Sequence, residues 1–163
     1  MDWAFQIRDS VSDHQADWII RDHFRKMITE GTFESWRRLH GPRYASIVKA
    51  LSTQSGVSAV ILPDGSIASY LLHETSLTAG GRIARVLAFR TIPDQRRKGM
   101  GRCLMNHLLE KLRREGVIAV DVEASVRSLP ARTLYETCGY QATSILYELR
   151  FLTNGIRSTR TSR

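Results

Sequence analysis

The sequence has only two cysteines, Cys103 and Cys138, and no apolar run approaching the roughly 18 residues that a membrane-spanning helix needs. Two cysteines 35 residues apart do not form a disulfide framework and do not have the spacing of zinc ligands. The five histidines lack H-E-x-x-H or H-x-x-x-H spacing, which argues against a bound metal. The first residues, MDWAFQIRD, contain an early acid and no basic segment before an apolar one, unlike a secretory signal. We therefore expect a cytoplasmic protein with no metal and no membrane contact.

The composition is that of an ordinary globular chain of 163 residues, with 42% hydrophobic and 25% charged residues. We expect one domain over residues 1–153 and a disordered basic tail over residues 154–163. The net charge is +8, from 24 Lys and Arg against 16 Asp and Glu, which favours an anionic partner. The positive charge is concentrated in residues 82–102, which contain seven cationic side chains and one acid, Asp94.

The hydrophobic pattern alternates between strand and helix periods, which predicts an α/β fold around a mixed sheet. Ser12 to Gln15 fits a capping box at a helix start, and Gly41-Pro42 divides a helical stretch over Phe33–Ser52. Leu104, Leu108 and Leu112 form one apolar stripe. Strands are expected over Trp3–Arg8, Val57–Leu62, Ile67–Thr75, Ile83–Ile92, Val117–Ala124 and Ile145–Leu152, and further helices over Ala16–Gly31, Gly99–Glu115 and Pro130–Cys138.

The stretch Phe89–Leu104, F-R-T-I-P-D-Q-R-R-K-G-M-G-R-C-L, carries the first chemical signal. A strand ends there, and a loop with two glycines leads directly into a helix, where backbone N–H groups and the helix dipole favour a pyrophosphate. The stretch is not a Walker A loop, because no G-K-[ST] follows, and it lacks the G-x-G-x-x-G of a dinucleotide-binding fold.

The second signal is the segment E-A-S-V-R-S-L-P-A-R-T-L-Y-E-T-C-G-Y at Glu123–Tyr140. R-x-x-G-x-G at Arg96–Gly101, followed by a helix, a strand and A-x-x-L-Y-E-x-x-G-Y, resembles the GNAT (GCN5-related) N-acetyltransferases over Ile83–Phe151. The upstream hairpin and N-terminal helices fit the order of the same family. The resemblance implies a mainly antiparallel central sheet flanked by helices. It also implies acetyl-coenzyme A as donor and direct transfer to an amine acceptor in a ternary complex.

The resemblance also implies roles for individual residues. Tyr135 matches the family's tyrosine that protonates the departing thiolate, and a phenol of pKa about 10 can protonate a thiolate of parent pKa about 8.5. Ser128 stands where the family commonly has Asn, seven residues earlier, and a hydroxyl does not replace the paired donor and acceptor of an amide. The cofactor is expected to bind to the turn and its charges, and its pantetheine arm to the edge of the strand. The residues of these two regions are Phe89, Arg90, Thr91, Arg96, Arg97, Lys98, Gly99, Met100, Gly101 and Arg102.

The general base is assigned to Glu123, which ends a strand 12 residues before Tyr135. This arrangement is similar to the ribosomal-protein N-terminal acetyltransferase branch of the family. The alternative is a strand-end carboxylate that pairs with Arg127 or Arg132. Glu74 and His73 are reserve candidates, and the base could act through water.

The acceptor is an amine whose identity, small molecule or peptide, the sequence does not specify. Acetylation of a protein N-terminus is one alternative, and a cofactor-binding sensor without turnover is another. A nucleic-acid-binding module is a third, but no helix-turn-helix, RNP sequence or zinc knuckle supports it. A homodimer is left open. Trp18, Phe33, Trp36 and Tyr44 either line the acceptor groove or fill the core, and Cys103 and Cys138 are expected to be small core residues.

Overall fold

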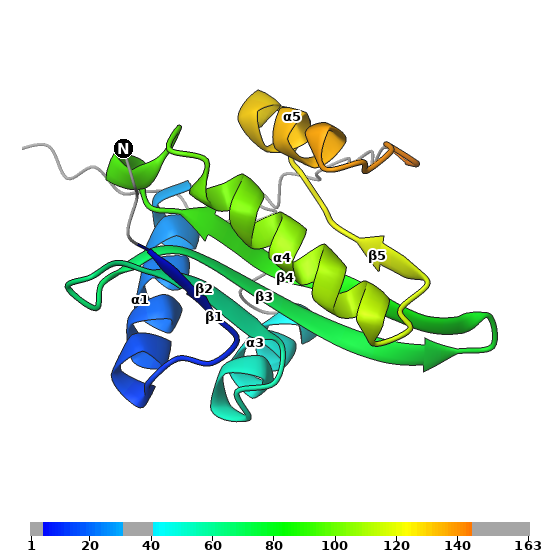
Figure 1. Ribbon diagram of the computed structural model, residues 1–163, viewed down its shortest axis with the longest axis horizontal. Helices are drawn as coiled ribbons and strands as arrows, with labels where there is room; N and C mark the ends of the chain where they lie inside the picture. Colours follow the sequence, from blue (N-terminus) through cyan, green and yellow to red (C-terminus); the bar gives the residue numbers. More distant parts are fainter. Residues whose placement is uncertain (1–4, 31–40, 145–163) are drawn as a thin grey trace, which may run out of the picture.

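The computed structural model describes residues 5–30 and 41–144. In this part of the chain a single sheet has the strand order β1-β2-β3-β4-β5, antiparallel throughout except for the last, parallel pair. Helices cover both faces (Figure 1), so the expected mixed, mainly antiparallel α/β architecture is confirmed. The elements are β1 (Gln6–Arg8), α1 (Asp13–Glu30), α3 (Pro42–Ser52), β2 (Val57–Ile61), β3 (Ile67–Thr78), β4 (Gly81–Thr91), η1 (Pro93–Gln95), α4 (Met100–Arg114), β5 (Ala119–Asp121) and α5 (Leu129–Thr137).

The local sequence signals for the N-terminal helices are confirmed. The Ser12 Oγ accepts a hydrogen bond from the Gln15 N–H at 3.2 Å, and the Gln15 Oε1 accepts one from the Ser12 N–H at 3.0 Å, which completes the capping box. Pro42 opens α3 after Gly41, where its missing N–H removes no helical bond. The expected strand Ile145–Leu152, the basic tail 154–163 and the helical residues 33–40 lie outside the described residues.

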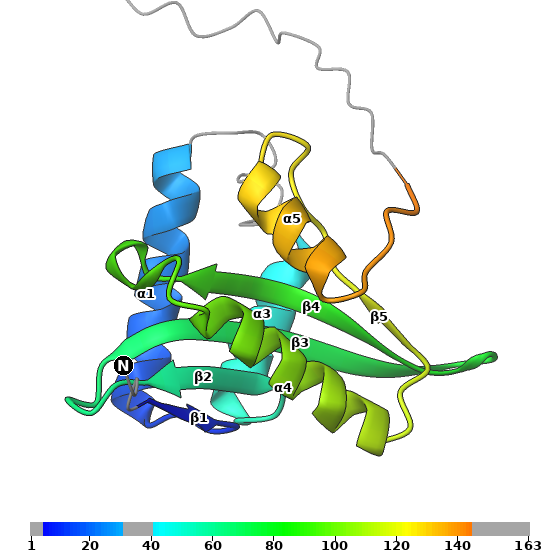
Figure 2. The same ribbon diagram turned by 45° about the horizontal axis from the view of Figure 1, so that its top comes forward.

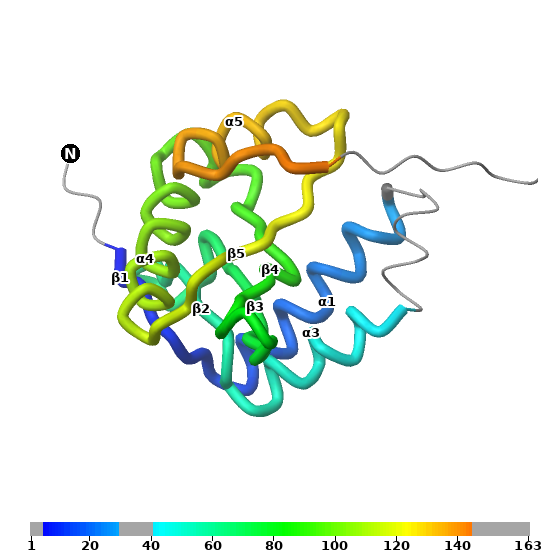
Figure 3. The backbone as a smooth tube through the Cα atoms, turned by 90° about the vertical axis from the view of Figure 1, so that its right-hand side faces the viewer, coloured from blue at the N-terminus to red at the C-terminus, as the bar shows by residue number. Residues whose placement is uncertain are grey.

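Two hydrophobic cores lie on opposite faces of the sheet. One is shared by α1, α3 and the sheet, and the other by α4, α5 and the sheet, as Figure 3 shows. The predicted stripe on α4 is confirmed, because Leu104, Leu108 and Leu112 are fully buried. Each such side chain contributes roughly 1.5–3 kcal/mol of burial free energy. None of the helices described is long and apolar enough to cross a bilayer.

A β-bulge bends β4 in the middle of its pairing with β3. Leu72 lies opposite Ala88 and His73 opposite Val86, so Leu87 has no partner residue on β3. Leu87 and Ala88 are consecutive, yet both pack into the core on the α1 and α3 face. An extra residue of this kind changes the direction of a strand and increases its twist.

The strand β5 is shorter than the expected Val117–Ala124. It pairs with β4 only through Ala119–Asp121, opposite Ile83–Arg85, and the bulge in β4 follows directly. After this bend, β4 and the segment that follows β5 diverge (Figure 2). In the described part of the chain, no strand pairs with this edge of β4 from Val86 onward. We call these two diverging segments, β4 from Val86 onward and the chain after Asp121, the wedge.

Candidate active site

The turn before α4 presents backbone N–H groups that come before the first helical hydrogen bond. Arg97 and Gly99 have positive φ angles of 60° and 79°, and no side chain caps the helix at Gly99. The first helical hydrogen bond runs from the Cys103 N–H to the Gly99 carbonyl at 3.0 Å. The amides of Met100 to Arg102 therefore precede the helical ladder and lie at the positive end of the helix dipole. This geometry suits an anionic group such as a pyrophosphate.

Cationic side chains surround the same turn. Arg96, Arg97 and Arg102 are exposed. Arg96 donates from Nε to the Thr91 carbonyl at 3.2 Å, and Lys98 donates from Nζ to the Gln95 Oε1 at 2.9 Å. Backbone donors and positive charge therefore occur together, as the pyrophosphate of coenzyme A requires. The Met100 side chain is buried in the core, so only its amide can contribute.

Gly101 lets α4 approach the end of β4 closely. A Cβ at this position would lie 3.0 Å from the Thr91 Oγ1 and 3.2 Å from the Phe89 Cζ. A larger side chain would push α4 away from the strand edge that is expected to meet the pantetheine arm. Glycine is therefore needed here for packing as well as for the approach of a ligand, a requirement that the sequence pattern alone did not reveal.

Side chains at the end of β4 point to both faces of the sheet. Phe89 points to the α4 face, where its ring lies 6.3 Å from the ring of Tyr135. Arg90 takes part in the opposite face, with its Nε 3.0 Å from the Asp22 carboxylate, which also accepts a hydrogen bond from the Tyr70 hydroxyl at 3.1 Å. The side chain of Arg90 is thus engaged with α1, and its backbone is what it can offer to a cofactor. No sequence signal pointed to the cluster of Asp22 and Tyr70.

Tyr135 is brought to the wedge by α5. Its side chain is largely buried, and its ring lies 5.7 Å from the ring of Tyr140. Burial raises the pKa of Tyr140, whose hydroxyl donates to the Met105 Sδ at 3.5 Å, so Tyr140 is a poorer proton donor than an exposed phenol. Ser128 is the N-cap residue of α5, but its hydroxyl makes no capping hydrogen bond.

Glu123 lies on the other face of the sheet. Val120 and Val122 pack toward the α4 core, whereas Glu123 lines a cavity together with Pro42 and Arg43 at the start of α3. The Glu123 Oε2 accepts a hydrogen bond from the Arg43 Nη1 at 2.7 Å. One partner of Glu123 is thus Arg43 on α3, which sequence spacing could not indicate because the two residues are 80 positions apart. The sequence had suggested Arg127 or Arg132.

A cavity of about 330 Å³ opens beside Glu123. Glu74, one reserve base, lines the same cavity and lies opposite Arg85 across β3 and β4. His73, the other reserve base, follows the alternation to the α4 face, where burial lowers its pKa. The structure therefore groups Glu74 with Glu123 and separates His73 from them. The lining residues are Gly41, Pro42, Arg43, Ser46, Glu74, Arg85, Leu87 and Glu123.

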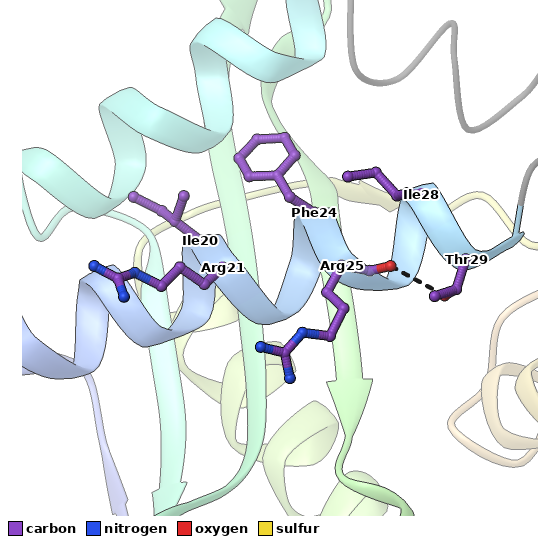
Figure 4. A pocket seen from close by; sticks show the side chains of 6 residues that line it. All are labelled: Ile20, Arg21, Phe24, Arg25, Ile28 and Thr29. Atoms are coloured by element: carbon purple, nitrogen blue, oxygen red, sulfur yellow. Dashed lines mark hydrogen bonds between the residues drawn. The ribbon is translucent and has the colours of Figure 1, made fainter.

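A second hollow of about 430 Å³ lies along α1. Figure 4 shows Ile20, Phe24 and Ile28 along one side of the helix, with the Arg25 side chain pointing away from them. Phe24 also packs against Tyr44, with ring centroids 5.1 Å apart. The residues that line this hollow include no acid, base or nucleophile for acetyl transfer, so it is not the candidate active site.

The cysteine prediction needs a correction. Cys103 is exposed on α4 rather than buried. The apolar stripe of that helix faces the sheet, and Cys103 lies outside the stripe. Cys138 is half-buried at the end of α5, where burial raises the pKa of its thiol. Over residues 5–30 and 41–144, no three His, Cys, Asp or Glu residues gather as a metal site.

Known proteins resemble this chain in sequence and in fold. The acetyltransferase (GNAT) family model matches residues 15–140. The [ribosomal protein bS18]-alanine N-acetyltransferase of Escherichia coli (strain K12) is 36% identical over 53 residues, and this match spans 32% of the chain and 36% of that relative. The Salmonella typhimurium enzyme of the same name matches over the same shares.

Solved structures with the same fold cover almost the whole chain. A putative acetyl transferase from Pyrococcus furiosus superimposes with a TM-score of 0.67 at 15% identity, covering 90% of this chain and 99% of that one. An aminoglycoside acetyltransferase from an uncultured soil metagenomic sample gives 0.62 at 18% identity, covering 91% and 99%. At such identities the likeness shows the fold, whereas the family match covers most of the chain. The protein thus belongs to the acetyltransferase (GNAT) family.

Proposed function

We propose that the protein transfers an acetyl group from acetyl-coenzyme A to a primary amine, directly and in a ternary complex. Acetyl-coenzyme A supplies an acetyl thioester and a pyrophosphate. The amine nitrogen forms a bond to the acetyl carbon while the carbon–sulfur bond breaks. Glu123 accepts the proton lost by the amine, and Tyr135 donates a proton to the sulfur.

The observation that carries this proposal is the placement of the two groups on opposite faces of one wedge. Tyr135 lies beside Phe89 on the α4 face, where the turn before α4 offers its amides and cations. Glu123 lines a cavity on the α3 face. A thioester that enters from the α4 side and an amine that enters from the α3 side would meet at the unpaired edge of β4 between them.

The cofactor half of the proposal gives each residue of the turn a role. Amides of Arg97 to Arg102, including those of Gly99, Met100 and Gly101, bind the pyrophosphate, and the cations of Arg96, Arg97, Lys98 and Arg102 neutralise its charge. The backbone of Phe89, Arg90 and Thr91 pairs with the pantetheine arm, because strand edges bind extended ligands through main-chain hydrogen bonds.

The acceptor half of the proposal gives Glu123 the task of making the amine neutral. A lysine amine of pKa about 10.4 is almost fully protonated at pH 7 and needs a base, whereas an α-amine of pKa about 7.7–8.0 needs little help. A second candidate function, acetylation of a protein N-terminus, is favoured by the partial match to the bS18-alanine N-acetyltransferases.

A panel of amines tests the proposal and separates the two candidates. Thiol release from acetyl-coenzyme A is measured with a peptide that begins with alanine, a lysine peptide with a blocked N-terminus, a polyamine and an aminoglycoside. We expect turnover with at least one amine and none when every amine in the panel is acetylated beforehand. Coenzyme A should also raise the Tm, because a ligand that binds only the folded state stabilises it. Turnover confined to the alanine peptide would select the N-terminal candidate, and absence of both turnover and the Tm shift would overturn the proposal.

A further inference from the structure

One guanidinium contacts both segments that form the wedge, β4 and the segment after β5. Arg43, in the first turn of α3, donates from Nη2 to the Val86 carbonyl at 3.0 Å and from Nη1 to the Glu123 Oε2 at 2.7 Å. Val86 is the first residue of β4 beyond the last pair with β5, and Glu123 comes two residues after the end of β5. Arg43 therefore bridges the wedge at the point where the sheet hydrogen bonds between β4 and β5 stop.

The bridge has a well-anchored base. Pro42 fixes the start of α3, and Ile47 and Leu51 on the same helix are buried in the core against the sheet. The Arg43 side chain is only 17% exposed, whereas that of Glu123 is 52% exposed. The arginine is thus held by packing, and the carboxylate at its end is still reachable from the cavity.

Among the described residues, β4 gives the backbone around Glu123 no comparable support. Pairing of β5 with β4 ends at Asp121, and α5 does not begin until Leu129. A carboxylate on such a connecting segment can adopt many positions unless its side chain is fixed. A base must lie within hydrogen-bond reach of the proton that it removes, so its position limits its efficiency.

We propose that Arg43 positions Glu123 for the acceptor amine. The inference depends on the proposed role of Glu123 as base. Arginine suits the task because its planar guanidinium offers two donors at a fixed separation, one for the strand carbonyl and one for the carboxylate. Lysine, with a single ammonium group on a flexible stem, can reach either partner but cannot hold both in the same geometry.

A double-mutant cycle tests this inference. The variants are Arg43→Met, Arg43→Lys, Glu123→Gln and the double variant Arg43→Met/Glu123→Gln, with Lys49→Met as the control for loss of an exposed cation on the same helix. Steady-state rates are measured with saturating acetyl-coenzyme A and the best amine of the panel. The Tm and its increase with coenzyme A are recorded for each variant, so that misfolding is recognised.

We expect Arg43→Met to lower kcat/KM by about 10²-fold, the loss typical of a misplaced catalytic group, and Arg43→Lys to lower it by about tenfold. Coenzyme A should still raise the Tm of both, and Lys49→Met should stay within about twofold of wild type. The double variant should be no more than about threefold worse than Glu123→Gln, because Arg43 has nothing left to position. Losses that multiply, or an Arg43→Met variant as active as wild type, would overturn the proposal.

A titration of the Glu123 carboxyl by ¹³C NMR supplies a readout that needs no acceptor. Removal of an adjacent cation makes a carboxylate easier to protonate, so the titration midpoint should rise in Arg43→Met and stay unchanged in Lys49→Met. An unchanged midpoint in Arg43→Met would contradict the bridge itself. If Glu123→Gln keeps full activity while the midpoint shifts as expected, the bridge exists, but Glu123 is not the base. The proposed function then fails in its choice of base, and the positioning role falls with it.

Discussion

The two faces of the wedge are built from different kinds of sequence. On the α4 face, the turn at Arg96–Arg102 and the residue Tyr135 come from segments that each carry a continuous motif. On the α3 face, Arg43, Glu74 and Glu123 come from three separate elements, and no local pattern joins them. The α4 face offers backbone amides at the start of a helix, whereas the α3 face presents charged side chains around a cavity.

This difference explains why the cofactor half of the site is easy to recognise and the acceptor half is not. Backbone binding requires glycines at fixed positions, as at Gly99 with its φ of 79° and at Gly101 with its close neighbours. Side-chain binding requires only that the side chains meet in space, and many sequences can satisfy that.

The largest expected effect lies on the α4 face. Tyr135→Phe should lower kcat by up to about 10²–10⁴-fold, because the ring still packs against Phe89 and Tyr140 while the proton is lost. Cofactor affinity should not change. Tyr140→Phe is the matched control and should stay within about twofold, since the hydroxyl of Tyr140 contacts only the Met105 sulfur among the hydrogen bonds described. A Tyr135→Phe variant with wild-type kcat would make this residue structural.

On the α3 face, Glu123→Gln should lower kcat/KM by about 10²-fold near neutral pH. In the wild type the rate should rise with pH through an apparent midpoint that belongs to the carboxylate or to the coupled amine. The glutamine variant should lose or shift this limb, which a profile of kcat/KM against pH at saturating cofactor will show. A uniform loss with an unchanged profile would indicate that Glu123 only orients the acceptor, and no loss would move the role to Glu74.

A smaller effect is expected in a test of whether the cofactor binds at the α4 face. Arg102→Glu places an acid beside the unpaired amides of the first turn and should weaken coenzyme A binding by about tenfold or more. Arg113→Glu makes the same charge change in the last turn of α4 and should leave binding within about twofold. Isothermal titration with coenzyme A measures both. Equal losses in the two variants would mean that net charge, not the turn, attracts the cofactor.

Gly101→Glu is a less selective probe of the same turn. Its Cβ would already lie 3.0 Å from Thr91 and 3.2 Å from Phe89, so the fold at the end of β4 changes together with the binding site. The exposed Arg102 avoids this difficulty.

The smallest effect concerns the edge of the sheet at β1, away from the wedge. Burial would raise the pKa of Asp9, but hydrogen bonds from Ser58 and His107 and the charge of Lys111 outweigh it and lower that pKa. The carboxylate therefore stabilises the fold above its ordinary pKa of about 4, and this contribution is lost as the pH falls through the lowered value. Asp9→Asn should cost under about 1 kcal/mol at pH 6, since Asp9 is 40% exposed, and less at pH 3.

Urea unfolding at the two pH values measures this difference, and kcat should be unchanged in the same variant. A large loss of activity in Asp9→Asn would show that the β1 edge of the sheet is coupled to the candidate active site. The two faces of the wedge could then not be compared as independent local sites.

Much of the fold followed from local rules. The capping box at Ser12 and Gln15, the break at Gly41-Pro42 and the leucine stripe of α4 each depend on neighbouring residues, and all three are present. The length of β5 did not follow from local rules, because strand pairing depends on a second strand. The expected Val117–Ala124 pairs only where β4 runs beside it, and the bulge at Leu87 ends that contact. The exposure of Cys103 was missed because the expectation was based on the usual burial of cysteine and not on the position of this residue beside the leucine stripe of α4.

The sequence by itself determined the family, the glycine-containing turn before α4 and the candidacy of Tyr135 and Glu123, since these are written in contiguous motifs. Only the tertiary structure decided that Gly101 lies against Thr91 and Phe89, that Arg90 is engaged by Asp22, and that Arg43 pairs with Glu123. The physical reason is range. Backbone conformation and helix capping are set by residues a few positions apart, whereas a salt bridge between α3 and the segment after β5 forms only when the sheet has brought them together.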